Sequence, residues 1–150
     1  MNRVGSEKVD VNKIHSDCIA DKLRLINRVI TSIYDDAFRP LGITINQMNI
    51  IVVVAKFEPA NLNQVGKWLH MEKSTLSRNI SLMTKNGWLQ TAPLGHGRSL
   101  EIRLTRQGRA LLKKGTPYWE KAQDRVGSML KKQGVEEVKR IANDIRASAN

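Results

Sequence analysis

The stretch from residue 72 to residue 104 constrains the fold more than any other part of the chain. Its first half carries apolar residues at steps of four and three and stops at Gly87, a residue type common just after a helix. Its second half has two short segments with strand character, 88–92 and 100–104, joined by a glycine-containing loop. The stretch therefore predicts a short amphipathic helix followed directly by a β-hairpin.

Charge is distributed unevenly around this stretch. From Lys73 to Trp119 the chain has nine Lys or Arg but only one acid, Glu101, against 25 and 14 in the whole sequence. The formal net charge of +11 and the pI near 10.2 indicate a polyanionic partner, either nucleic acid or an acidic membrane surface. A merely basic protein is the alternative, but cations gathered on a helix and a hairpin favour DNA.

The residues before this stretch predict three more helices. Apolar residues at steps of three and four predict a first long helix from Ile14 to Phe38, ended by Pro40. Thr44 and Gln47 have the spacing of a capping box and open a helix that runs to about Phe57. The β-branched run inside it is equally compatible with a buried strand, and the cap signal favours the helix.

A second cap signal and a long C-terminal pattern complete the chain. Residues 61–64 repeat the cap spacing before a third, shorter helix. After the hairpin, Thr105 is expected to cap a helix that runs to about Lys132, with Gly115 and Pro117 bending or briefly breaking it. A final helix is expected after Gly134.

This order of elements predicts a mainly helical (α+β) protein with a winged helix-turn-helix lobe. We assign the lobe to residues 44–105, within a single domain of residues 1–150. The helices at 14–40 and 106–148 are apolar on one side and remote from the lobe in sequence, so we expect them to mediate dimerisation.

The outward side of the helix in the 72–104 stretch carries the first candidate DNA contacts. Small hydroxylated residues allow close approach to a major groove, Arg78 can bind guanine in bidentate fashion, and the first helical turn offers free backbone N–H groups to phosphate. An ordinary solvated helix face, the alternative, normally mixes charges of both signs. The candidates are Lys73, Ser74, Thr75, Ser77, Arg78 and Asn79.

The hairpin loop carries the second set of candidates. Gly95 and Gly97 permit a tight tip, with His96 and Arg98 beside them. An arginine at such a tip suits the negative potential of a narrow minor groove. His96 and Arg98 are therefore the predicted DNA contacts of the wing.

With these motifs in place, the chain resembles the MarR family of winged-helix transcription regulators over residues from about 14 to 148. The matching stretches are LGITINQ (residues 41–47), the helix-turn-helix at 62–89 and LTRQG at 104–108. The resemblance implies a homodimer with interlocked terminal helices. Such a dimer reads a pseudo-palindromic site on double-stranded DNA, usually as a repressor that a small ligand or oxidation releases.

The resemblance also assigns residues, with one departure. Family DNA contacts carry over to Ser74, Thr75, Ser77 and Arg78 in the helix, and to Arg98 at the wing. The family wing commonly reads Asp-Arg-Arg, whereas this chain has His-Gly-Arg at residues 96–98. Without the Asp that orients the arginine, we expect a more mobile wing with a smaller contribution to binding.

Three further residues are candidates for regulation. Some relatives use a first-helix cysteine as a peroxide sensor, which makes Cys18 a candidate redox site. Its neighbours Asp17 and Asp21 disfavour the reactive thiolate, and no second cysteine exists, so a structural role is the stronger reading. Tyr34 and Phe57 are candidates for the crevice where relatives bind phenolic or aromatic ligands, with core packing as the alternative.

Several other classes of function are excluded or left open by the sequence. The three histidines are too scattered for metal-ligand spacing, and we find no nucleophile–base pair, phosphate loop or cofactor motif, so no enzyme, metal or cofactor is expected. The longest apolar run, residues 50–55, is far shorter than the ~20 residues of a membrane helix. With no signal peptide and a single cysteine, a cytoplasmic protein is expected. A non-specific architectural or RNA-binding winged helix remains open.

Overall fold

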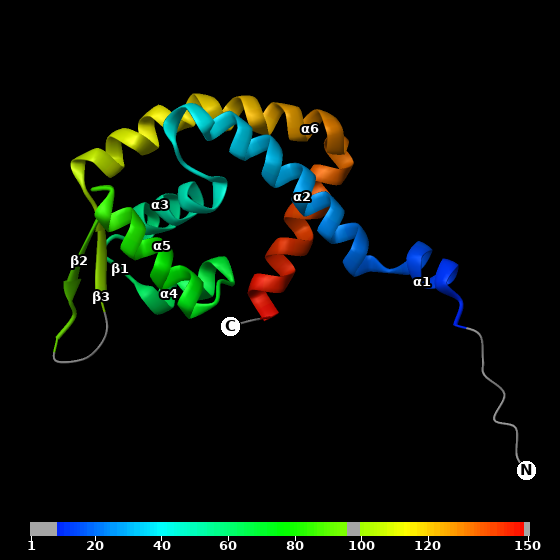
Figure 1. The fold of residues 1–150 in the computed structure, drawn as a ribbon, viewed down its shortest axis with the longest axis horizontal. Helices are drawn as coiled ribbons and strands as arrows, with labels where there is room; N and C mark the ends of the chain where they lie inside the picture. The colour runs from blue at the N-terminus through cyan, green and yellow to red at the C-terminus, as the bar shows by residue number, and fades with distance from the viewer. Residues whose placement is uncertain (1–8, 96–99, 149–150) are drawn as a thin grey trace, which may run out of the picture.

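The computed structural model describes residues 9–95 and 100–148, and it is mainly helical with one small sheet at its edge (Figure 1). This confirms the predicted fold class. The elements in chain order are α1 (Val11–Asp17), α2 (Ile19–Phe38), the 3-10 turn η1 (Arg39–Leu41), α3 (Ile45–Phe57), β1 (Ala60–Asn61), α4 (Leu62–Leu69), α5 (Lys73–Lys85), β2 (Leu89–Pro93), β3 (Leu100–Leu104) and α6 (Arg106–Ser148).

The helices of the lobe begin at the caps that the sequence predicts. At α3, the Thr44 hydroxyl accepts from the Gln47 N–H at 3.3 Å, and the Thr44 N–H donates to the Gln47 side chain at 3.1 Å. At α4, the Asn61 side chain accepts from the Gln64 N–H at 2.9 Å. These bonds satisfy backbone donors that a helix start leaves free, and they resolve the helix–strand ambiguity of α3 in favour of the helix.

One apolar core holds the lobe, which we define as α3 to β3, together. It joins α3, α4, α5 and the sheet. The apolar residues of α5 at steps of four and three, Leu76, Ile80 and Met83, all belong to it. Its buried members are Ile50, Ile51, Val53, Val54, Ala60, Val65, Leu76, Ile80, Met83, Leu89, Ile102 and Leu104. The inward face of α5 is therefore fixed by packing, and its opposite face is left for solvent or a partner.

The sheet has three strands where the sequence predicts two. Its order is β1-β3-β2 with antiparallel pairing, so Ile102 of β3 lies between Ala60 on one side and Thr91 on the other. The missed strand β1 has two residues, too few to show the alternation by which a strand is recognised. It closes the sheet against the start of α4.

The prediction of one helix from Ile14 to Phe38 is wrong at its N-terminal end. The chain forms α1 and α2 with an extended residue, Cys18, between them (φ −67°, ψ 104°). Ser16, Asp17 and Cys18 all have low helix propensity, and Asp21 in the first turn of α2 favours a helix that starts after Cys18.

The prediction for the C-terminal helices is confirmed at its break near Lys132, but no break occurs at Gly115 or Pro117. α6 continues through Gly115 and Pro117, and its described part consists of two helices that meet at a kink at Lys131 (φ 59°, ψ 166°), close to the predicted boundary. Gly115 is a packing residue, because a Cβ there would lie 2.2 Å from the Met48 methyl group. Packing against neighbouring helices thus keeps the backbone of α6 helical at Gly115.

A second apolar cluster joins the lobe to the long helices. α2 and α6 run side by side as an arch, and the start of α3 packs beneath them (Figure 1). The buried members of this cluster are Ile33, Tyr34, Phe38, Ile43, Met48, Ala122 and Val126. Only the C-terminal third of α2 is covered in this way, and its earlier apolar residues stay exposed.

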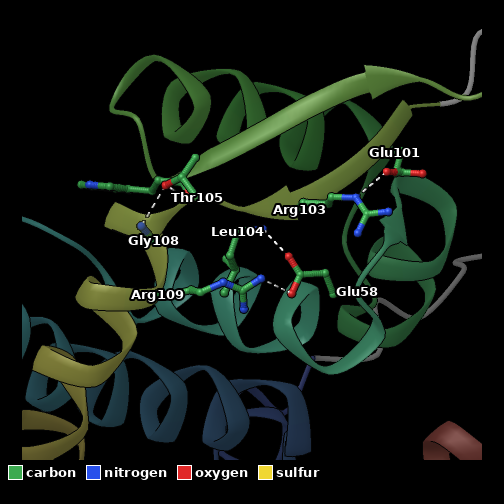
Figure 2. A network of polar contacts seen from close by, with 8 residues as sticks. Glu58, Glu101, Arg103, Leu104, Thr105, Gly108 and Arg109 are labelled. Carbon is green, nitrogen blue, oxygen red and sulfur yellow. Dashed lines mark hydrogen bonds and ion pairs between the residues drawn. The ribbon is translucent and has the colours of Figure 1, made fainter.

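Polar bonds fix the base of the hairpin to the helices on either side of it (Figure 2). The Glu58 carboxylate accepts from the Leu104 N–H at 2.9 Å and from Arg109 at 2.6 Å, which connects the end of α3 to β3 and α6. The Thr105 hydroxyl accepts from the Gly108 N–H at 3.0 Å, which confirms the predicted cap of α6. The hairpin is therefore held rigidly at its base.

Among the described residues, no single helix is long and apolar enough to cross a bilayer. Residues 19–41 and α3 pass such a test only when taken together, and they are bent by 79° at the break between them. Much of α3 is buried in the lobe core.

Two helical glycines should respond to alanine in opposite directions. A Cβ on Gly66 would meet Leu76 Cδ2 at 3.5 Å, an ordinary contact, whereas a Cβ on Gly108 would lie 2.1 Å from the Trp88 carbonyl oxygen. We expect Gly66→Ala to stabilise the fold by about 0.5–1 kcal/mol through helix propensity. Gly108→Ala should destabilise it by about 1–3 kcal/mol through overpacking. Urea unfolding of both variants measures the two shifts, and shifts of the same sign would contradict this packing.

Glu58 should make the stability pH-dependent. Partial burial raises the pKa of Glu58, but hydrogen bonds from Arg109 and the Leu104 N–H, with the charges of Arg109 and Arg103, outweigh it and hold the pKa below its ordinary value of 4.5. The resulting stabilisation is complete above the unfolded-state pKa and is lost as the pH falls through the folded-state pKa. Glu58→Gln should therefore lose up to about 1 kcal/mol at pH 7, because Arg109 is largely exposed.

The measurement is urea unfolding of the wild-type protein and Glu58→Gln between pH 7 and pH 3. The difference in unfolding free energy should shrink as the pH falls below 4.5. Glu136→Gln is the matched control, because it removes the same charge from an exposed ion pair with Lys139 that involves neither Glu58 nor its partners. A difference that is independent of pH would rule out Glu58 as the source.

Candidate nucleic-acid interface

A tight turn positions α5 against α4. α4 ends at His70 in the left-handed conformation (φ 49°), and the His70 N–H points back to the carbonyls of Gly66 and Lys67. The Met71 N–H also donates to the Gly66 carbonyl, at 3.1 Å. These bonds satisfy the last carbonyls of α4 and set the direction in which the chain enters α5.

The N-terminal turn of α5 is exposed on the lobe surface. Lys73, Ser74 and Thr75 are exposed there, and Ser77 and Arg78 are exposed one turn further on. The N-cap residue Glu72 makes no side-chain capping bond with the residues that the structure describes, and the first turn contains no acid. Free N–H groups, hydroxyls and an arginine thus face the same space, an arrangement suited to phosphate and base edges.

Asn79 is placed less favourably than the other candidates of α5. It is half-buried, and its side-chain amide donates to the Thr75 carbonyl at 2.9 Å on its own helix. That bond leaves the carbonyl oxygen of the Asn79 amide for a partner, so the side chain is oriented by the helix.

The electrostatics of this surface are dominated by unpaired cations. Within residues 9–95 and 100–148, Lys73, Arg78 and Lys85 take part in no ion pair. The acid of the hairpin, Glu101, is engaged by Arg103 at 2.6 Å and so does not reach across to α5 (Figure 2). The positive charge of α5 therefore remains available to a polyanion.

The hairpin lies at the same end of the molecule as α4 and α5, away from α1 (Figure 1). Its strands lead to a tip that begins at Gly95, which adopts a positive φ of 64° as its sequence position suggests. The predicted wing contacts His96 and Arg98 lie outside the described residues. The structure therefore fixes where the wing starts and ends, next to the exposed face of α5.

The two candidate effector residues line separate cavities. Tyr34 lies beside Asn46, Asn49 and Trp119 in a cavity of about 310 Å³ between α2, α3 and α6. Its hydroxyl donates to the Gln123 side chain, and burial raises the pKa of the phenol.

Phe57 lines a larger cavity, of about 680 Å³, with residues of α4, the α4–α5 turn and the end of α6. A ligand that contacts both Tyr34 and Phe57 is therefore not supported. Each cavity has the size of a small-ligand site by itself.

The other candidate regulatory residue, Cys18, is half-buried at the junction of α1 and α2. The junction of α1 and α2 lies away from the lobe (Figure 1). The described residues contain no group of three or more His, Cys, Asp or Glu side chains suited to a metal ion.

Two residues that matter for the interface are absent from the sequence-based candidates. Glu58 anchors the hairpin through bonds to β3 and α6, and Trp68 on α4 contacts Phe57, Lys56 and Arg146. Their partners are distant in sequence, so no local pattern reveals them. The Pro59 that follows Glu58 signals only the end of α3.

Comparison by sequence is silent, since no family model and no curated protein sequence matches the chain. Comparison by structure, in contrast, finds similar proteins. The transcriptional regulator MosR from M. tuberculosis superposes with a TM-score of 0.75 at 28% identity, covering 88% of this chain and 96% of MosR. MosR in complex with DNA also gives a TM-score of 0.75, at 25% identity, with 88% and 98% covered.

Two more distant structures share the fold. A mutant MarR from E. coli complexed with operator DNA has a TM-score of 0.77 at 15% identity, with 89% of this chain and 96% of MarR covered. BpsR from Bordetella bronchiseptica, whose DNA binding is regulated by 6-hydroxynicotinic acid, has a TM-score of 0.76 at 18% identity, with 87% and 94% covered. The chain therefore shares the winged helix-turn-helix fold of these transcriptional regulators.

Proposed function

We propose that this protein binds double-stranded DNA in a sequence-specific manner, as a homodimer on a pseudo-palindromic operator, and acts as a repressor in the cytoplasm. Each protomer contributes one lobe, with α5 in a major groove and the wing beside it. Two-fold symmetry then places the half-sites about one helical turn apart.

The observation that carries this proposal is the N-terminal turn of α5. It presents exposed hydroxyls, Arg78 and uncapped N–H groups on a helix whose other face is buried. Arg78 supplies the bidentate geometry that distinguishes guanine, while Lys73 and the hydroxyls position the helix on phosphates. DNA complexes of MosR and MarR with the same fold support the assignment.

The homodimer is supported by the apolar residues that one chain leaves uncovered. α2 exposes Ile19 (73%), Leu23 (59%) and Ile26 (42%) on one stripe. The end of α6 exposes Ile141 (45%) and Ile145 (52%). Contiguous apolar surface of this kind marks an interface, and both segments are the predicted dimerisation helices.

We further propose that a small aromatic ligand relieves DNA binding. Support comes from the cavities lined by Tyr34 and Phe57, and from the regulation of BpsR by 6-hydroxynicotinic acid. Either cavity adjoins an element that positions the lobe, so an occupant there would shift α5. Cys18 is the alternative trigger, by oxidation.

Selection of bound duplexes from a random pool, followed by competition at fixed salt, tests the function. A specific reader should prefer its selected duplex over random duplex by about 10³-fold or more. A ratio near one would replace the proposal with the non-specific architectural or RNA-binding reading. Repeating the competition with peroxide and with hydroxylated aromatic acids tests the two triggers.

Arg78 should carry base preference. We expect Arg78→Ala to weaken binding to the selected operator by about 1–3 kcal/mol and to relax preference at one base position of each half-site. Lys85→Ala is the matched control, because it removes the same charge from the far end of α5. Both variants are measured against a panel of single-base operator changes, and an unchanged preference in Arg78→Ala would remove Arg78 from the readout.

Leu23 should be required for dimerisation. Leu23→Glu places a charge within the exposed apolar stripe of α2, which burial against a partner cannot tolerate. We expect a monomer by sedimentation equilibrium and a large loss of operator affinity. Ser32→Glu adds the same charge about half a turn round the helix and should remain dimeric. If Leu23→Glu also remains dimeric, the stripe is not the interface.

A further inference from the structure

An aromatic cluster with two cations lies behind the α4–α5 turn. The rings of Phe57 and Trp68 meet edge to face, with centroids 5.1 Å apart. The Lys56 ammonium lies 4.2 Å from the centroid of the Trp68 ring. The guanidinium carbon of Arg146 lies 5.3 Å from the same ring, within the distance of a cation–π interaction.

Arg146 contacts this cluster from a segment that is distant from α4 in the sequence. It lies near the C-terminus of α6, beyond the non-helical residue Lys131. Figure 1 shows this last part of α6 leaving the arch and running back to α4.

The space between the two elements is a cavity of about 680 Å³, lined mostly by α4 and the α4–α5 turn. Arg146 spans that space with its long side chain. It is the residue that α6 contributes to the described lining of the cavity.

The two residues of this contact, Trp68 and Arg146, lie in segments with different proposed roles. Trp68 lies on α4 two residues before His70, where the chain changes direction into α5. Arg146 is on the same segment as Ile141 and Ile145, the exposed apolar residues proposed to pack on the partner. The Arg146–Trp68 contact therefore connects the DNA-reading lobe to the dimer frame by a route separate from the base of α6.

We propose that Arg146 on Trp68 is a positioning contact that sets the spacing between the two half-sites which the dimer accepts. This inference rests on the proposed dimeric, operator-reading function. Insertion or deletion of one base pair moves the second half-site by about 3.4 Å and rotates it by about 34°. To follow that shift a lobe must swing relative to its frame, and the swing breaks the contact.

The energetics predict an unusual pattern for Arg146→Ala. The contact is present in the free protein. On this proposal it is kept in the complex with the best-spaced operator, so its loss should leave that affinity almost unchanged. In a complex with a shifted operator the wild-type protein has to break the contact, whereas the variant has nothing to break. Binding to shifted operators should therefore become about 2- to 5-fold tighter for each contact broken, the size of an exposed cation–π interaction.

The experiment measures full-length protein on the selected operator and on versions with one base pair inserted or removed between the half-sites, each over a range of salt. Arg146→Lys keeps a cation and should stay closer to the wild-type protein than Arg146→Ala. Arg140→Ala is the matched control, since it removes the same charge from the same segment. In the wild-type protein the Arg140 side chain pairs with Glu137 and Asp144. Arg140→Ala should leave the spacing preference unchanged.

Each result of this experiment either supports or overturns the proposed role of Arg146. Tighter binding of Arg146→Ala to shifted operators, with an unchanged salt slope, supports the positioning role. An unchanged ratio between best-spaced and shifted operators overturns it. A salt slope lower by about 0.9 also overturns it, because Arg146 would then be a phosphate contact. If wild-type protein shows no preference for the selected operator at all, the proposed function fails first, and that result is distinguishable from the others.

Discussion

The structure depends on the burial of one face of α5. Leu76 and Met83 are fully enclosed by α3, α4 and the sheet, and Ile80 is nearly so. Because an α-helix returns to the same direction about every 3.6 residues, fixing these side chains also fixes which residues point away from the core. The exposed hydroxyls and Arg78 are thus presented by packing.

The features that the sequence predicts well are those set by neighbours along the chain. The caps at Thr44, Asn61 and Thr105 each depend on a residue three positions later, and all three form as expected. The inward spacing within α5 is equally local. Features of this kind depend only on nearby residues, so they form in the folded protein as predicted. The corresponding helix boundaries are shifted by a residue at most.

The features that the sequence misses depend on contacts between distant segments. β1 exists because Ala60 meets Ile102, and two residues cannot display a strand period by themselves. Gly115 is tolerated inside α6 because the Met48 methyl group occupies the space of its missing side chain. The separation of Tyr34 and Phe57 into two cavities likewise follows from the arch of α2 and α6, which no local pattern describes.

The uncapped start of α5 has a consequence for the free protein. A Ser, Thr, Asp or Asn at the N-cap would contribute about 1 kcal/mol, and Glu72 makes no such bond in the described structure. The first turn of α5 is therefore expected to fray when the protein is alone. Phosphate oxygens would supply the acceptors that this turn lacks. Local order at the reading surface would then be acquired from the ligand, and a better cap would make the helix more stable while competing with DNA for the same N–H groups.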